Sequence, residues 1–270
     1  FFFHAEHGIR DPLWSRGLGD VYKRQLLLFT PDGTTRGMSI RQAASQGVRE
    51  VLETVRQLRH YANIAWYLLA RMLFNDGMVG VLIFGGVYAS GNFDWGTITL
   101  LIFGLVTSTS AMIGAYIGGL LDDRFGSMKT LKISIWMSGV ILVFMTSIAP
   151  GSILFFVPVD TMPVWSFPYF PTIAELTYLG ATQVFALFFV TGLSTSRTVM
   201  ARISPPEMAT QFFGLYGLSG SVTAFLAPLL VAIVTDISQS QRIGFASLAL
   251  LIFFGGLLLT KVTEERAEVA

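Results

Sequence analysis

The chain of 270 residues contains no cysteine, few charged residues and only three histidines. The lack of cysteine excludes disulfide bonds, iron–sulfur clusters and thiolate-bound zinc. Two of the histidines, His4 and His7, lie in an atypical N-terminal stretch, which argues against a histidine metal site. Charged residues make up 13% of the chain, against roughly a quarter in a soluble domain. The sequence therefore predicts an integral membrane protein.

Motifs for covalent or phosphate chemistry are also missing. The sequence has no phosphate-binding loop, no HExxH pair and no GxSxG nucleophile elbow. An enzyme embedded in the membrane would need a nucleophile, a base or metal ligands clustered at one depth, and no such cluster is visible. We expect no catalytic residues, no metal site, no cofactor and no nucleic-acid partner.

What the chain does have is six apolar stretches of about 20 residues, the length of helix that crosses a bilayer of about 30 Å. They cover residues 66–88, 97–121, 130–149, 176–199, 212–235 and 243–260. The predicted fold class is therefore an all-α, multi-pass membrane protein.

The connections between these spans alternate in charge. Odd-numbered connections, counted from Tyr88, contain a single basic residue, Arg242. Even-numbered connections, together with the span ends next to them, contain Arg124, Lys129, Lys132, Arg197 and Arg202. Because Lys and Arg mark cytoplasmic loops, both termini are predicted to be cytoplasmic, in the plasma membrane if the protein is bacterial.

The sequence divides into five segments. Residues 1–25 fit nothing that follows and end in a stretch that resembles a translated sequencing adaptor, so we interpret them as non-native or as a disordered tail. We then expect the end of a truncated membrane helix and a turn (26–37), an amphipathic linker helix on the cytoplasmic surface (38–63), the six-helix domain (64–261) and a cytoplasmic tail (262–270).

The connection 150–175 carries five prolines and six aromatic residues. Prolines at this density prevent a continuous helix, and aromatic side chains suit the membrane interface. We expect an external loop on the membrane surface, with a cap over a substrate path as the alternative.

The first span contains three polar residues, Arg71, Asn75 and Asp76. A lone acidic group near the middle of a bilayer needs a partner, a water-filled cavity or a proton. Arg71 lies about 140° around the helix from Asp76 and aligns instead with Asn75. Asp76 therefore either serves a solute and proton pathway or only caps a helix break before Gly77. Arg71 either faces the same cavity or extends to the cytoplasmic surface.

Other polar and small residues in the spans allow two interpretations. Gln183 and Tyr88 line the solute pathway, or they form hydrogen bonds between helices. In the fifth span, a stripe of small residues predicts close helix packing and a proline predicts a kink. These residues are Gly214, Gly217, Gly220 and Pro228.

The connection after the second span resembles the cytoplasmic loop motif of the major facilitator superfamily. Gly119, Asp123, Arg124 and Gly126 match that motif in spacing, although Ser127 and the residue after it replace the usual basic pair. The resemblance implies a conformational latch, in which the acidic group pairs with the arginine and with a neighbouring helix N-terminus.

Other stretches resemble the vacuole-effluxer-like family within that superfamily. They are residues 69–77, 202–207 and 212–228. The resemblance implies a twelve-span transporter of which this chain holds the C-terminal half. Its partners are then the lipid bilayer, a small-molecule solute and the missing N-terminal six-helix half.

The expected function is secondary active transport by alternating access, with the solute site between the two halves. The resemblance points to amino-acid efflux, and Asp76 to proton coupling. A membrane receptor or scaffold that does not transport remains the alternative.

Overall fold

The computed structural model describes residue 56 and residues 58–264. The segments 1–25 and 26–37, most of the linker helix in 38–63, and the tail beyond Glu264 lie outside the described residues. The tail predicted from residue 262 begins packed on the bundle, because Val262 is only 2% exposed. Asn63 also exchanges two hydrogen bonds, of 2.8 and 2.9 Å, with the backbone of Thr263.

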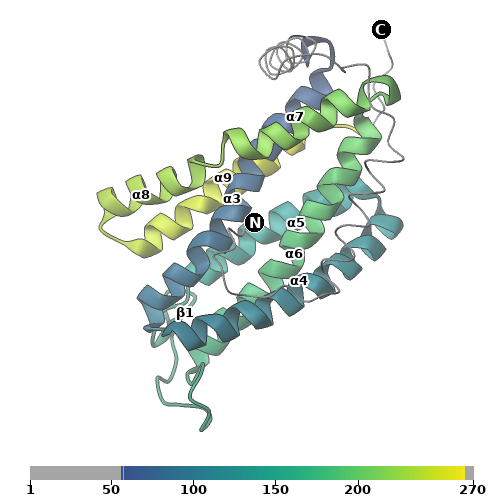
Figure 1. Cartoon of the computed structure of the whole chain (residues 1–270). Coiled ribbons are helices and arrows are strands. Elements are labelled where there is room, and N and C mark those ends of the chain that lie inside the picture. The colour runs from purple at the N-terminus through teal and green to yellow at the C-terminus, as the bar shows by residue number, and fades with distance from the viewer. Residues whose placement is uncertain (1–55, 57, 265–270) are drawn as a thin grey trace, which may run out of the picture. The chain divides into compact units, whose positions relative to one another are not determined.

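The described part of the chain is mainly helical (Figure 1). Its elements are η1 (Leu58–His60), α3 (Ala62–Phe93), α4 (Thr97–Phe125), α5 (Ser127–Thr146), β1 (Ser152–Ile153), β2 (Val157–Pro158), α6 (Ile173–Ile203), η2 (Pro206–Met208), α7 (Ala209–Val222), α8 (Leu226–Ser238) and α9 (Gln241–Leu259). With η2, α7 and α8 counted as one span, six helical segments are long and apolar enough to cross a membrane. The all-α, multi-pass fold is confirmed.

Glycines allow α3 and α9 to pack at very short range. A Cβ on Gly77 would lie 2.7 Å from a side-chain carbon of Ile252, and one on Gly255 would lie 2.6 Å from the backbone nitrogen of Phe74. Without an aqueous driving force between helices, such close packing is a main source of their association. The helix that carries Asp76 is thus fixed along α9.

We expect Gly255→Ala to destabilise the bundle by about 1–3 kcal/mol, the usual penalty for overpacking. The added methyl group would meet backbone atoms of α3 that cannot rotate away. Gly104→Ala is the matched control, because nothing lies within 4 Å of that Cβ position. Thermal unfolding in detergent compares the two, and equal melting temperatures would contradict the packing described.

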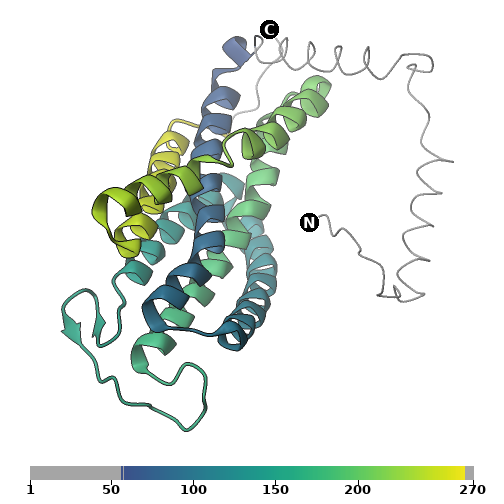
Figure 2. The same ribbon diagram turned by 60° about the vertical axis from the view of Figure 1, so that its left-hand side comes forward.

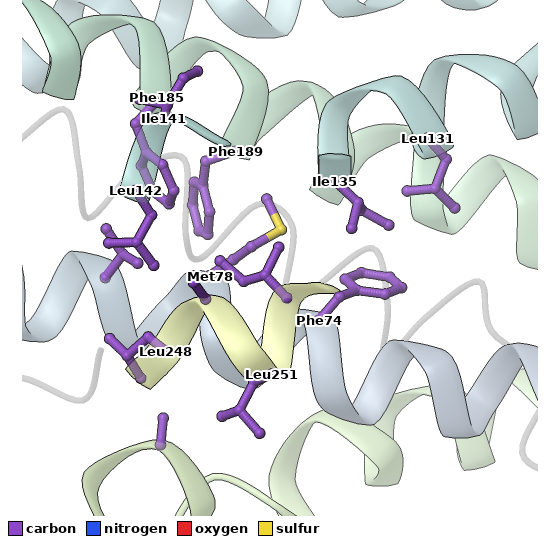
Figure 3. Packing of buried hydrophobic residues seen from close by; sticks show 14 of the residues in the cluster. Phe74, Met78, Leu131, Ile135, Ile141, Leu142, Phe185, Phe189, Leu248 and Leu251 are labelled. Carbon is purple, nitrogen blue, oxygen red and sulfur yellow. The ribbon is translucent and has the colours of Figure 1, made fainter. Parts of the chain in front are cut away.

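The apolar core lies where α3, α5, α6 and α9 meet (Figure 3). Phe74 and Met78 project from α3 towards Ile135 of α5 and Phe189 of α6 (Figure 3). Phe74, Met78 and Ile135 are at most 1% exposed. The core therefore holds the α3 segment around Asp76 from one side.

Two spans leave most of their surface uncovered within the described chain. Only 11% of the apolar window in α4 is buried, and 17% of that in 206–238, against 61% in α3. Gly214 and Gly217 of the small-residue stripe have nothing within 4 Å of their Cβ positions. The close packing predicted for these two glycines is not made within the part of the chain described here.

The fifth span is interrupted between α7 and α8, at residues 223–225 (Figure 1). Turn-like hydrogen bonds replace the α-helical ones, as between the Leu226 amide and the Thr223 carbonyl, at 2.7 Å. Pro228 has no N–H group, so the carbonyl four residues before it loses its helical donor. The kink predicted from Pro228 is therefore a complete break that begins five residues earlier.

The connection between α5 and α6 extends past the helix ends (Figure 2). It holds the antiparallel β1–β2 hairpin, in which Ser152 pairs with Pro158. A capping box of Thr172 and Glu175 starts α6, and Glu175 also accepts a hydrogen bond from the Trp95 indole at 2.8 Å. The loop is thus tied to the start of α4, while many of its aromatic side chains stay exposed.

Candidate functional site

Arg71 is buried between α3 and α7, with 8% of its surface exposed. Its Nη1 donates to the Tyr216 carbonyl at 2.8 Å and to the Ser219 hydroxyl at 2.6 Å. The guanidinium carbon lies 3.6 Å from the centre of the Tyr216 ring. A Cβ at Gly220 would sit 3.0 Å from Nη1, so a glycine there leaves room for the cation. The alternative in which Arg71 extends to the cytoplasmic surface is wrong, because the side chain binds α7 instead.

A polar network continues from this point to α6. The Ser196 hydroxyl lies 3.2 Å from the Tyr216 hydroxyl and 2.7 Å from the Tyr67 hydroxyl, which also donates to the Ser196 carbonyl. Tyr67 is fully buried. The network connects α3, α6 and α7 around the guanidinium of Arg71.

Asp76 lies about a turn and a half further along α3 and is 3% exposed. Among the described residues, its Oδ2 atom has no hydrogen-bond partner. Arg71 and the Thr223 side chain are the polar neighbours of this carboxyl group. The Thr223 hydroxyl donates a hydrogen bond to the Ser219 carbonyl at 3.3 Å. The site therefore has an acidic oxygen free to take a proton or a cationic group.

The capping alternative for Asp76 is wrong, because α3 runs without interruption from Ala62 to Phe93. The break lies instead in the neighbouring span, where Thr223 ends α7. Asn75 is buried beside Asp76, but among the described residues it has no hydrogen bond to Arg71. Arg71 and Asp76 thus lie near the end of α7, while for Asn75 burial is the feature that the structure shows.

The other two predicted pathway residues lie elsewhere. The Gln183 amide nitrogen donates to the Thr107 hydroxyl of α4 at 3.3 Å and to the Leu179 carbonyl at 3.2 Å. The Tyr88 hydroxyl donates to the Ile148 carbonyl at 3.2 Å, and the Tyr88 ring lines a cavity. Gln183 forms the hydrogen bond between helices that was the alternative. Tyr88 instead binds the connection that follows α5, and neither residue has a hydrogen bond to Asp76 among the described residues. Their role in a solute pathway stays a prediction.

The loop between α4 and α5 has a glycine of the predicted motif at a backbone position with positive φ. Gly126 has φ = +85°, which favours glycine, and its N–H donates to the Asp122 carbonyl at 2.9 Å. Asp123 and Arg124 are exposed, while Asp122 accepts a hydrogen bond from the Ser127 hydroxyl. Gly119 has nothing within 4 Å of its Cβ position. No ion pair joins Asp123 to Arg124 in the described chain, so the latch stays a prediction.

Sequence reasoning missed the residues of the fifth span that lie near Arg71 and Asp76. Tyr216, Ser219 and Thr223 recur at intervals of three and four residues, and Thr223 is the residue that ends α7. That spacing was the available signal. Ser196 could not be found in this way, because it lies among other small polar residues of α6.

Among the described residues, no group of three or more His, Asp or Glu side chains could hold a metal ion. The arrangement instead offers one buried cation and one buried carboxyl group beside an interrupted membrane helix. Broken helices at mid-membrane depth form solute and ion sites in secondary transporters.

Comparisons with known proteins identify the family of the chain. The family described as "Vacuole effluxer Atg22 like" matches residues 23–270. The chain is 25% identical over 213 residues to the "Uncharacterized MFS-type transporter YxiO" of Bacillus subtilis (strain 168), which covers 79% of this chain and 44% of that protein. It is 23% identical over 221 residues to "Autophagy-related protein 22" of Saccharomyces cerevisiae (strain ATCC 204508 / S288c), covering 77% and 37%.

A second "Autophagy-related protein 22", from Cryptococcus neoformans var. neoformans serotype D (strain JEC21 / ATCC MYA-565), is 23% identical over 211 residues, which are 78% of this chain and 36% of that protein. The chain thus spans less than half the length of these relatives. The family match covers most of the sequence and includes all six apolar helical segments. The chain belongs to the vacuole effluxer Atg22-like family of membrane transporters.

Proposed function

We propose that this chain is the C-terminal half of a secondary active transporter that moves a small solute by alternating access. The main support is the buried pair of opposite charges, Arg71 and Asp76, beside the interrupted span 206–238. Buried ionisable groups in membrane helices are costly and generally serve function. Both chain termini, and the end of the bundle at which α4 meets α5, are cytoplasmic in this proposal, because the basic connections lie there.

The solute site uses groups that the protein itself leaves unsatisfied. Both hydrogen bonds of Arg71 come from Nη1, and its buried Nε has no partner among the described residues. An unused guanidinium edge suits a carboxylate, which it binds through two parallel hydrogen bonds. The free oxygen of Asp76 suits an ammonium group. An amino acid carries both groups, which supports amino-acid efflux as the activity.

Proton coupling rests on Asp76. On its own helix the charged neighbour is Arg71, and on the facing span Thr223, the residue that ends α7, contributes a hydroxyl. The part of α9 packed against this turn is apolar and includes Leu248 and Ile252. With Arg71 already bound to α7, a solute ammonium or a proton neutralises the carboxylate, and competition between them couples the two movements.

The partner is the N-terminal six-helix half. The faces of α4 and of the span 206–238 are the least buried of the six spans in the described chain. Gly214 and Gly217 lie on the second of these faces with open Cβ positions. Small residues permit close approach of another helix, so these faces suit packing against the other half within the bilayer.

Solute protection of an introduced cysteine tests the proposal. The chain has no cysteine, so Thr223→Cys places a single thiol beside Asp76 once any cysteines elsewhere in the full-length protein are removed. We expect a water-soluble thiol reagent to label this cysteine, and a saturating amino-acid mixture to slow labelling at least about tenfold, as for a site mostly occupied by ligand. Met145→Cys, at a fully buried core position, is the unreactive control. Labelling of Thr223→Cys that no solute slows would contradict a solute site.

We propose no enzymatic activity, because the relatives that the chain matches include a protein named as a transporter. The receptor or scaffold alternative gives a distinct result in the same preparation. Such a protein would show solute protection but no exchange of labelled solute across liposomes.

A further inference from the structure

The cavity lined by Tyr88 lies between α3, α8 and α9, towards the membrane face that carries the β1–β2 hairpin. Its volume is about 390 Å³. Aromatic rings form one part of its wall and polar side chains another: Phe84, Tyr88 and Phe245, and Thr235, Asp236 and Gln241. Tyr88 is twelve residues from Asp76 on a continuous helix, which corresponds to about 18 Å. The cavity is thus separate from the Arg71–Asp76 site.

The polar side of this cavity is not used by the protein. The side chains of Thr235, Asp236 and Gln241 make no hydrogen bond to any described residue. Glycines on the facing helices give two of them room, because a Cβ on Gly91 would collide with the Gln241 carboxamide and one on Gly244 with the Thr235 hydroxyl. A hydroxyl, an amide and a carboxylate therefore line one cavity without internal partners.

The aromatic side is rigid. The rings of Tyr88 and Phe245 stack with their centres 4.8 Å apart and their planes 18° from parallel. The hydrogen bond from Tyr88 to the Ile148 carbonyl fixes the ring further. Both side chains are at most 3% exposed. Aromatic faces attract cations through the negative charge of the ring, and they attract apolar groups as well.

One acidic side chain, Asp236, lines the cavity, and no lysine or arginine is among the described residues that line it. The nearby cation, Arg242, does not line the cavity, since it donates to the Thr146 carbonyl and lies 4.7 Å from the centre of the Phe155 ring. Its guanidinium is therefore held by α5 and the following loop.

We propose that this cavity binds small organic ammonium ions, with Asp236 as the counter-ion and the Tyr88–Phe245 pair as the apolar wall. A pocket with an apolar wall and a few convergent polar groups is the usual form of a small-molecule site. We call this cavity the outer site. A role for it in the transport of the solute rests on the proposed function, whereas binding of an ammonium ion there does not require transport.

Calorimetric titration of the detergent-solubilised full-length transporter with benzyltrimethylammonium tests the inference. This probe keeps its charge at every pH. We expect Asp236→Asn to weaken binding by at least about tenfold and Tyr88→Leu to weaken it by a similar factor, from the loss of the ion pair and of the cation–π contact. Asp160→Asn, in the exposed loop, is the matched control and should bind as the unmodified chain does. Benzyl alcohol, which lacks the charge, should bind at least about tenfold more weakly.

The same titration separates this inference from the proposed function. If Asp76→Asn removes binding of the probe and Asp236→Asn does not, the probe occupies the Arg71–Asp76 site. The proposal of an outer ammonium site is then wrong, while the transporter proposal stands. Equal binding by the unmodified chain and Asp236→Asn also overturns the outer site. Unfolding curves of each variant confirm that it is folded, which is expected because Asp236 is exposed.

Discussion

Replacing Arg71 by lysine is expected to lower the rate of solute exchange by about tenfold to a hundredfold. Arg71 makes two hydrogen bonds from one nitrogen and lies against the face of Tyr216. Hydrogen bonds to charged groups contribute about 1.5–3 kcal/mol each, and losing one of them accounts for this range. Lysine keeps the charge but cannot stack as a planar group or offer a paired donor edge to a carboxylate.

The substitution also separates the two roles of Arg71. If the residue only fastens α7 to α3, Arg71→Lys lowers thermal stability and exchange together, and the Michaelis constant for the solute changes little. If it binds the solute carboxylate, as we propose, that constant rises several-fold. Arg197→Lys, at an exposed position of α6, is the matched control and should leave both unchanged. Normal exchange by Arg71→Lys would contradict a role at the solute site.

Replacing Asp76 by asparagine is expected to abolish pH-driven accumulation of solute while leaving exchange of solute for solute measurable. Asparagine has nearly the same shape but cannot take up a proton. The variant should fold, because it removes a buried charge whose Oδ2 has no hydrogen-bond partner among the described residues. Unpartnered charged groups in an apolar interior are costly, so its melting temperature should equal or exceed that of the unmodified protein.

The membrane-spanning segments could be predicted because length and hydropathy determine them locally. A helix in lipid satisfies its own backbone, so an apolar run of about 20 residues is sufficient evidence for a span. The break in the fifth span was predicted only as a kink, since Pro228 indicates that a helix is disturbed but not where its hydrogen bonds change. In the structure the change occurs at Thr223–Phe225, before the first residue of α8.

The contacts of the site could not be predicted, because they join distant parts of the chain. Arg71 binds Ser219, which is 148 residues away, and the Tyr67–Ser196 contact spans 129 residues. Helical spacing within α3 allowed Asn75 as the neighbour of Arg71, and only the position of α7 shows otherwise. Asp76 was predicted to need a partner, a water-filled cavity or a proton, and among the described residues the structure supplies no hydrogen-bond partner for its Oδ2.

The most direct test of the account is pH-driven uptake by the full-length transporter in liposomes, with and without Asp76→Asn. A gradient of one pH unit is worth about 1.4 kcal/mol per proton, so coupling of one proton to one solute supports an accumulation of up to about tenfold. We predict accumulation by the unmodified protein and simple equilibration by Asp76→Asn. Equal accumulation by both proteins would contradict the assignment of Asp76 as the coupling group.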